Sequence, residues 1–86
     1  MPRSDKSAQV VVTTNRGLVL IGVNAPDRPG LLLDISKGLL QLNLQLHHTE
    51  AAVVGERSVS VWRCAHLEDK ETDTEEIRAV LSVRVS

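Results

Sequence analysis

The sequence predicts an α+β domain, an open sandwich in which helices cover one face of a β-sheet. Short runs rich in valine, leucine and isoleucine, separated by turn residues, are typical of strands. Between and after these runs, apolar residues recur at the three- and four-residue spacing of amphipathic helices. A chain of 86 residues has the length of one small domain. We expect residues 1–7 to be a flexible lead-in and residues 8–86 to form that domain.

Two strands are expected at the start of the domain. Residues 8–14 and 17–25 are apolar runs separated by Asn15-Arg16-Gly17. Short β-branched runs that flank such a turn predict a hairpin. The following segment, residues 26–30, contains two prolines and a glycine and interrupts regular structure.

A helix of about a dozen residues is predicted to start at Leu31, because leucines and an isoleucine recur there at helical spacing. Asn43 is a suitable residue for its end, because asparagine tolerates the left-handed conformation. The residues of the apolar stripe are Leu31, Leu32, Ile35, Leu39, Leu40 and Leu42.

A second hairpin is predicted to follow the helix. Residues 44–54 have a strand-like pattern with imperfect alternation, and residues 58–66 form the next apolar run. Gly55-Glu56-Arg57 is the tight connection between them.

A second helix is predicted after a polar loop at residues 67–73, with Asp73 or Thr72 as its N-cap. Its apolar residues are Ile77, Val80 and Leu81. Residues 81–86 fit either an extension of this helix or a short strand, because Leu81, Val83 and Val85 also alternate.

The order of these elements is that of a ferredoxin-like βαββαβ open sandwich with an extra N-terminal strand. If residues 81–86 are helical, the extra strand can replace the last strand of that fold. A hairpin partner of residues 17–25 runs antiparallel to them, as the last strand of the fold would. The alternative is a domain whose last strand lies outside this sequence.

The strand at residues 17–25 is apolar on both of its sides, through Leu18, Val19, Leu20, Ile21 and Val23. A strand that is apolar on both sides should be covered on both sides. Because the helices cover one face, we expect another copy of the domain on the second face or at an edge. The alternative is a central strand with a few exposed side chains.

Charge and composition exclude several classes of protein. The net charge is −1, from ten basic and eleven acidic residues, so a nucleic-acid partner or an anionic membrane is not expected. No apolar run approaches 18 residues, and the first residues lack the apolar segment of a signal peptide. The single cysteine, Cys64, forms no internal disulfide, which fits a reducing compartment. These features predict a cytoplasmic location and also fit an organelle.

The sequence D-R-P-G-L-L at residues 27–32, placed between a predicted strand and a predicted helix, resembles the ACT family. The similarity continues through residues 42–46 and 55–64 and covers about residues 17–82. Within that family it looks most similar to the sensor domains of bacterial nitrogen-sensing uridylyltransferases and to plant ACT-repeat proteins. The resemblance implies a non-catalytic regulatory domain that senses an amino acid or a similar small metabolite.

The resemblance also implies where that ligand binds, namely between two subunits, a homodimer or a pair with a sister ACT domain. Free N–H groups at a helix start suit a carboxylate, and Asp27 suits an ammonium group. Two alternatives stay open: Asp27 caps the helix, or the domain docks a protein partner without a small ligand. The implied ligand-binding residues are Asp27, Arg28, Gly30, Leu31 and, from the neighbour, Gln45.

The histidines and the cysteine do not form a recognisable catalytic or metal-binding pattern. His47 and His48 are adjacent on a predicted strand and should point to opposite faces. Cys64 and His66 lie on the neighbouring strand without zinc-ligand spacing or an orienting third group. We therefore expect no catalytic residue, no metal and no cofactor, and a small enzyme using His47 or His48 is the least favoured alternative. Trp62 is expected to anchor the core or an interface.

Overall fold

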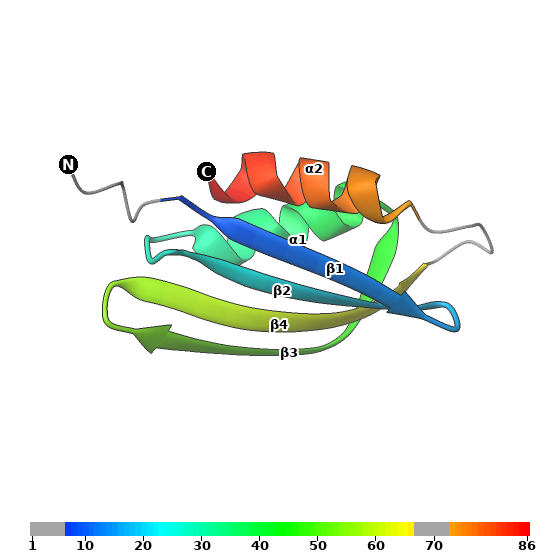
Figure 1. The fold of residues 1–86 in the computed structure, drawn as a ribbon, viewed down its shortest axis with the longest axis horizontal. Helices are drawn as coiled ribbons and strands as arrows, with labels where there is room; N and C mark the ends of the chain where they lie inside the picture. Colours follow the sequence, from blue (N-terminus) through cyan, green and yellow to red (C-terminus); the bar gives the residue numbers. More distant parts are fainter. Residues whose placement is uncertain (1–6, 67–72) are drawn as a thin grey trace.

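The computed structural model describes residues 7–66 and 73–86 as a small α+β domain. Two helices pack on one face of a four-stranded antiparallel sheet (Figure 1). Residues 1–6 of the expected lead-in at 1–7 and residues 67–72 of the expected polar loop at 67–73 lie outside the described residues. The elements are β1 (Gln9–Asn15), β2 (Leu18–Pro26), α1 (Leu31–Gln41), β3 (Leu44–Val54), β4 (Arg57–His66) and α2 (Thr74–Val85).

The strands lie in the order β1-β2-β4-β3, and every neighbouring pair is antiparallel. β1 pairs with β2 from Gln9 opposite Asn24 to Asn15 opposite Leu18. The predicted first hairpin is therefore confirmed, and its first strand occupies one edge of the sheet. β3 forms the other edge, and a register shift between Leu46 and His48 marks a bulge in it.

Residues 81–85 belong to α2, which resolves the ambiguity at this part of the sequence. Ile77, Leu81 and Val85 are buried at four-residue intervals, whereas Val83 is exposed. A strand would have placed Leu81, Val83 and Val85 on one face. The observed burial therefore follows the four-residue spacing of a helix and not the two-residue alternation of a strand.

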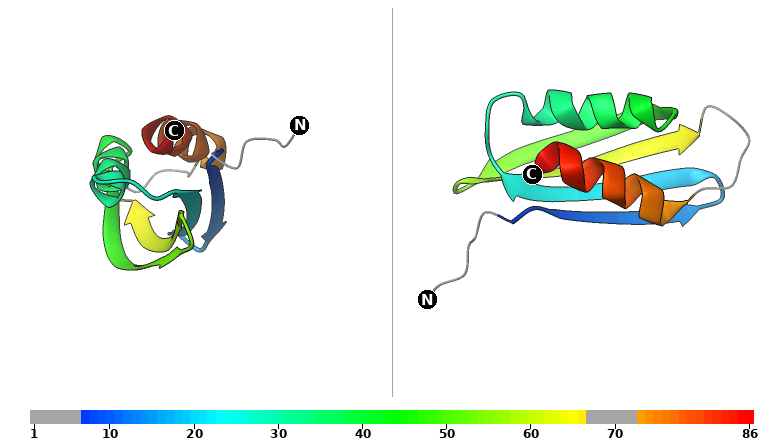
Figure 2. Two further views of the ribbon diagram at one scale, coloured as in Figure 1. Left: turned by 90° about the vertical axis from the view of Figure 1, so that its left-hand side faces the viewer. Right: turned by 90° about the horizontal axis from the view of Figure 1, so that it is seen from above.

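Both helices lie on the same side of the sheet, as the views in Figure 2 show. Trp62 is buried in the core between the layers, and its indole nitrogen donates a hydrogen bond of 2.8 Å to the hydroxyl of Ser60. α1 and α2 approach closely at Gly38, where an added Cβ would lie 2.7 Å from Cδ2 of Leu81. Trp62 is thus a core residue of this chain.

The two helix starts are stabilised differently. The carboxylate of Asp73 accepts hydrogen bonds from the N–H groups of Glu75 and Glu76, so Asp73 is the N-cap of α2. Thr72, the other predicted cap, lies outside the described residues. α1 has Gly30 as its N-cap and receives no side-chain cap. The alternative prediction that Asp27 caps this helix is therefore wrong.

Asn43 ends α1 in the predicted left-handed conformation, with φ of 59°. Gly30 is also left-handed, with φ of 81°. Most side chains are strained in this region, which glycine adopts without cost, so the backbone of the turn itself favours glycine at position 30.

The face of the sheet opposite the helices, called the open face below, is partly apolar. Along β2, Val19, Ile21 and Val23 are buried toward the helices, while Leu18 and Leu20 are exposed on the open face. The sequence pattern of a strand that is apolar on both sides is therefore present in the structure, with one side uncovered in the single chain.

No helix within residues 7–66 and 73–86 is long and apolar enough to cross a membrane.

Candidate functional site

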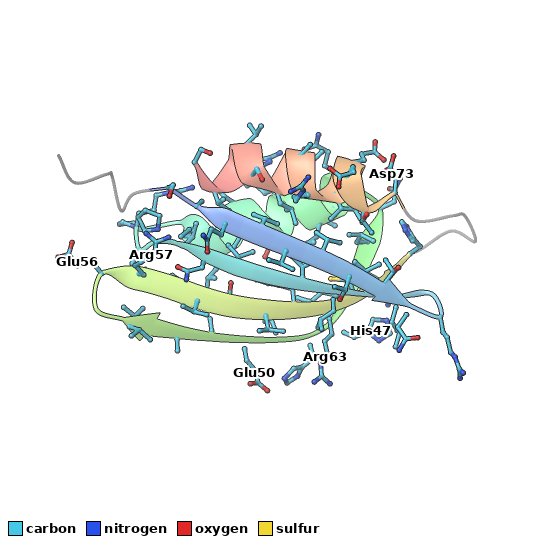
Figure 3. All side chains as sticks on the ribbon, viewed as in Figure 1. His47, Glu50, Glu56, Arg57, Arg63 and Asp73 are labelled. Carbon is cyan, nitrogen blue, oxygen red and sulfur yellow. The ribbon has the colours of Figure 1, made fainter. Side chains whose placement is uncertain are left out.

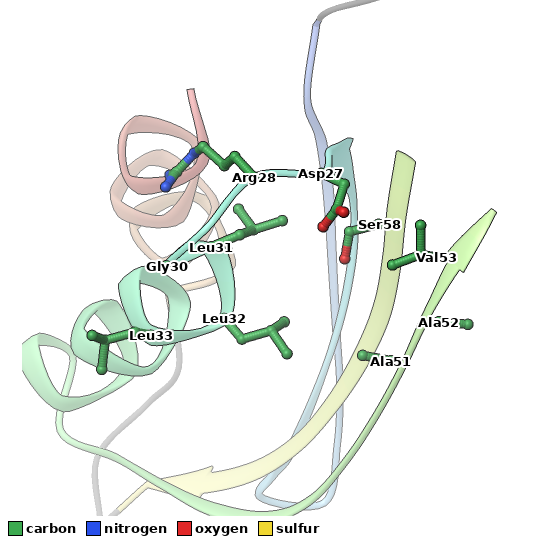
Figure 4. Close-up of a pocket in the computed structure, with 10 residues that line it drawn as sticks. All are labelled: Asp27, Arg28, Gly30, Leu31, Leu32, Leu33, Ala51, Ala52, Val53 and Ser58. Atoms are coloured by element: carbon green, nitrogen blue, oxygen red, sulfur yellow. The ribbon is translucent and has the colours of Figure 1, made fainter. Parts of the chain in front are cut away.

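A groove of about 470 Å³ lies between the turn that joins β2 to α1 and the last residues of β3. Figure 4 shows the side chains around it. The chain brings these segments together because β3 and β4 form a hairpin that ends beside the turn: Ser58 of β4 pairs with Ala25 of β2, one residue before Pro26. The groove is lined by Asp27, Arg28, Gly30, Leu31, Leu32, Leu33, Ala51, Ala52, Val53 and Ser58.

Most of the groove wall is apolar. Leu32 and Leu33 of α1 are 43% and 58% exposed, and Val53 of the edge strand is 59% exposed. Leu31 is buried and continues the groove into the core. A ligand with an aliphatic part would cover these side chains and remove apolar surface from water.

Ser58 provides a hydroxyl at the groove. The residue is 4% exposed, and its hydroxyl has no hydrogen-bond partner among the described residues. The oxygen atom is not fully buried, since the fully buried side-chain atom without a partner in the described ranges is Nε2 of His66. The Ser58 hydroxyl is therefore available to donate to or accept from a polar group bound in the groove.

The first turn of α1 provides unpaired donors next to Ser58. Leu31 N–H bonds to the carbonyl of Arg28, and Asp34 N–H bonds to the carbonyl of Gly30. The N–H groups of Leu32 and Leu33 have no acceptor among the described residues. Together with the positive end of the helix dipole, they suit a carboxylate.

Asp27 provides a carboxylate without a partner in the described chain. Its main-chain N–H is anchored, because it donates a hydrogen bond of 2.9 Å to the carbonyl of Glu56 in the β3–β4 turn. The carboxylate is exposed and lines the groove (Figure 4). It is therefore available to a cationic group of a ligand.

Arg28 lies at the groove, but its guanidinium group is directed toward α2, away from Asp27 (Figure 4). It donates a hydrogen bond of 2.9 Å to the carbonyl of Arg84 and forms a 2.9 Å ion pair with Asp34. The structure thus gives Arg28 a role in holding the turn against α2. Its predicted contact with a ligand would require these partners to separate.

Gln45 does not line the groove of its own chain. It lies at the beginning of β3 and pairs with Ala65, whereas the groove uses residues 51–53 at the other end of the strand. Alternation from the buried Leu44 places Gln45 on the open face. The prediction for Gln45 concerned a neighbouring subunit and stays a prediction.

Four residues predicted from the sequence line this groove, namely Asp27, Arg28, Gly30 and Leu31, whereas Ser58 was not predicted. Serine is an unusual residue on the buried side of a strand, and Ser58 and Ser60 alternate with Val59 and Val61. This alternation could have predicted Ser58 as a site residue, because it places two hydroxyls on the side of the strand that faces the core.

Outside the groove, two titratable side chains of the described residues have shifted pKa values, Cys64 and Glu50. Burial raises the pKa of the Cys64 thiol to about 11, so the nucleophilic thiolate is scarce at neutral pH. The exposed Glu50 accepts a 2.9 Å hydrogen bond from His48, which lowers the pKa of this carboxyl. No group of three or more metal-ligating side chains occurs within the described ranges.

Comparison with known proteins gives one partial similarity. The bifunctional uridylyltransferase/uridylyl-removing enzyme of Methylococcus capsulatus is 33% identical over 57 residues, which are 66% of this chain and 6% of that enzyme. This chain therefore corresponds to a small part of the enzyme's length. No protein-family model and no solved structure match the chain.

Proposed function

We propose that this chain is a regulatory domain of the ACT class, without catalytic activity, that binds an amino acid or a similar small metabolite in the groove. The strand order is compatible with a ferredoxin-like sandwich in which β1 takes the place of the last strand. The D-R-P-G-L-L turn and the partial similarity to a uridylyltransferase/uridylyl-removing enzyme support the same class. We also propose a cytoplasmic location, which fits the single cysteine of the chain.

One observation carries the ligand proposal: polar groups of three kinds remain unpaired around one apolar groove. They are the N–H groups of Leu32 and Leu33, the hydroxyl of Ser58 and the carboxylate of Asp27. An amino acid carries a carboxylate for the N–H groups and an ammonium for Asp27. Its side chain then covers the apolar wall.

Ligand binding would affect α2 through Arg28. The groove begins at the turn that contains Arg28, and Arg28 is bonded to the last turn of α2. A ligand that binds more tightly to one position of the turn also favours one position of α2. Regulation requires such a difference in ligand affinity between two conformations. We propose that the domain acts on attached or associated domains in this way.

The test is a thermal-unfolding screen of the common amino acids, followed by calorimetric titration of any that shift the midpoint. A ligand at 100 times its dissociation constant stabilises the fold by about 2.7 kcal/mol. Asp27→Asn and Ser58→Ala should weaken binding about tenfold or more. Ser36→Ala is the matched control, because the Ser36 hydroxyl bonds to Leu32 of its own helix and does not line the groove.

The absence of a shift with every amino acid would contradict the ligand proposal. The second candidate function is then a protein-interaction or assembly domain that pairs with a second copy or a sister domain. The exposed apolar side chains of the open face favour this candidate.

A further inference from the structure

The open face carries aliphatic side chains from three neighbouring strands. They share this face because they alternate with buried residues, and each is between 39% and 62% exposed. Figure 3 shows Glu50 and Arg63 pointing the same way, away from the helices. The aliphatic residues are Val11, Leu18, Leu20, Val59 and Val61.

Gly22 lies in the middle of these side chains, paired with Val11 of β1 and Val61 of β4. Its backbone is regular: it has no positive φ, and the pairing on both of its sides continues without a bulge. A Cβ added to Gly22 would meet no atom within 4 Å. The fold of the single chain therefore gives no reason for glycine at this position.

A glycine inside a strand weakens the fold by about 0.5–1 kcal/mol relative to alanine. Glycine at such a position is typical of a site that another chain or molecule approaches closely. On this face, Gly22 forms a notch with Leu20 beside it on the same side of the strand. The face thus carries both a projection and a hollow that fits one.

A projection and a hollow side by side make a surface complementary to itself. If a two-fold axis passes between Leu20 and Gly22, the Leu20 side chain of each copy lies over Gly22 of the other. The charges agree with self-pairing, because Glu50 and Arg63 give this face both signs. The face has no exposed aromatic residue, since Trp62 is buried, so it lacks what a base-stacking surface needs.

We infer that the open face binds a second copy of this chain, sheet against sheet, with Leu20 of each copy seated on Gly22 of the other. The two sheets would be about 10 Å apart, as in β-sandwiches. The open face is then the partner surface of the proposed regulatory domain. It leaves the groove accessible, because the groove lies between α1 and β3 and uses none of these residues.

Sedimentation equilibrium of the chain and two variants tests this inference. The chain should associate reversibly to a dimer as its concentration rises. Gly22→Val fills the notch, and its Cβ would meet no atom of its own chain within 4 Å, so dimerisation should weaken roughly tenfold or more while the thermal midpoint is unchanged or higher. Leu20→Glu should abolish the dimer. Leu40→Glu, at an exposed leucine of α1, is the matched control and should leave the dimer intact.

A chain that stays monomeric at every soluble concentration overturns the inference, and so does a Gly22→Val dimer as tight as the parent. A dimer lost in Leu40→Glu and kept in Leu20→Glu also overturns it, since the partner then binds elsewhere. If Gly22→Val does not fold, Leu20→Glu decides alone. The amino-acid screen repeated on Gly22→Val separates the two proposals, because a ligand response without a dimer leaves the proposed function standing.

Discussion

The guanidinium of Arg28 donates a hydrogen bond of 2.9 Å to the main-chain carbonyl of Arg84, which joins the β2–α1 turn to the last turn of α2. Carbonyls at a helix end have no partner within the helix, so Arg28 satisfies one of them. The same guanidinium is paired with Asp34 at 2.9 Å. One side chain therefore connects the turn with both helices.

Arg28→Gln should lower the free energy of unfolding by about 1–2 kcal/mol, because a charge-assisted hydrogen bond and a partly buried ion pair are lost. Urea unfolding followed by the fluorescence of the buried Trp62 measures this. Arg78→Gln is the control, because Arg78 pairs with Glu75 on the exposed surface of α2 and should contribute about 0.5 kcal/mol or less. Equal effects of both substitutions would contradict the role given to Arg28.

Gly38→Val should lower the free energy of unfolding by about 2–3 kcal/mol. A Cβ at this position would lie 2.7 Å from Leu81, whose side chain is fully buried and has little room to move. Lys37→Val places the same side chain on the exposed neighbouring residue and should cost a few tenths of a kcal/mol. A Gly38→Val protein as stable as the Lys37→Val protein would show that the helices are farther apart.

The thiol of Cys64 should react very slowly with a thiol reagent in the folded protein at neutral pH and rapidly once urea unfolds it. Burial removes access and raises the pKa of the thiol to about 11, from 9.0 for an exposed cysteine. The unfolded chain loses this proton first as the pH rises, so stability is complete below pH 9 and falls between pH 9 and 11. The loss should reach about 2–3 kcal/mol.

Cys64→Ala is the control for that pH dependence, since its stability should fall less over the same range. Rapid labelling of the folded protein at neutral pH would contradict the burial of Cys64.

Asp73→Ala should lower the free energy of unfolding by about 1 kcal/mol, because its carboxylate accepts the hydrogen bonds of two N–H groups at the start of α2. Asp73→Ser should retain most of that stability, since a serine hydroxyl can accept the same bonds. Chemical unfolding of the three proteins provides the comparison. A serine variant as unstable as the alanine variant would assign the effect to the charge of Asp73.

Local patterns in the sequence were sufficient for most elements. The predicted strand at residues 44–54 has the bounds of β3, and the run at 8–14 is displaced by one residue from β1. The predicted start of the first helix at Leu31 agrees with α1. These features depend on side-chain periodicity and turn residues, which act over a few positions of the chain.

The end of the chain could not be assigned in this way, because Leu81, Val83 and Val85 fit both a strand and a helix. Burial of Leu81 against Gly38 of α1 agrees with the helix, and that contact joins residues far apart in the sequence. The cap of α1 was also undecided by local pattern. Gly30 adopts the left-handed conformation at this cap and leaves the carboxylate of Asp27 without a role in the helix.

The sequence by itself determined the class of fold and the turn at Asp27 to Gly30, because both depend on interactions within a short segment. Only the tertiary structure placed Ser58 at that turn, through the pairing of β2 with β4, and directed Arg28 toward α2. The groove and the notch at Gly22 each combine residues of different elements. Their geometry depends on long-range strand pairing and helix packing, which no local pattern encodes.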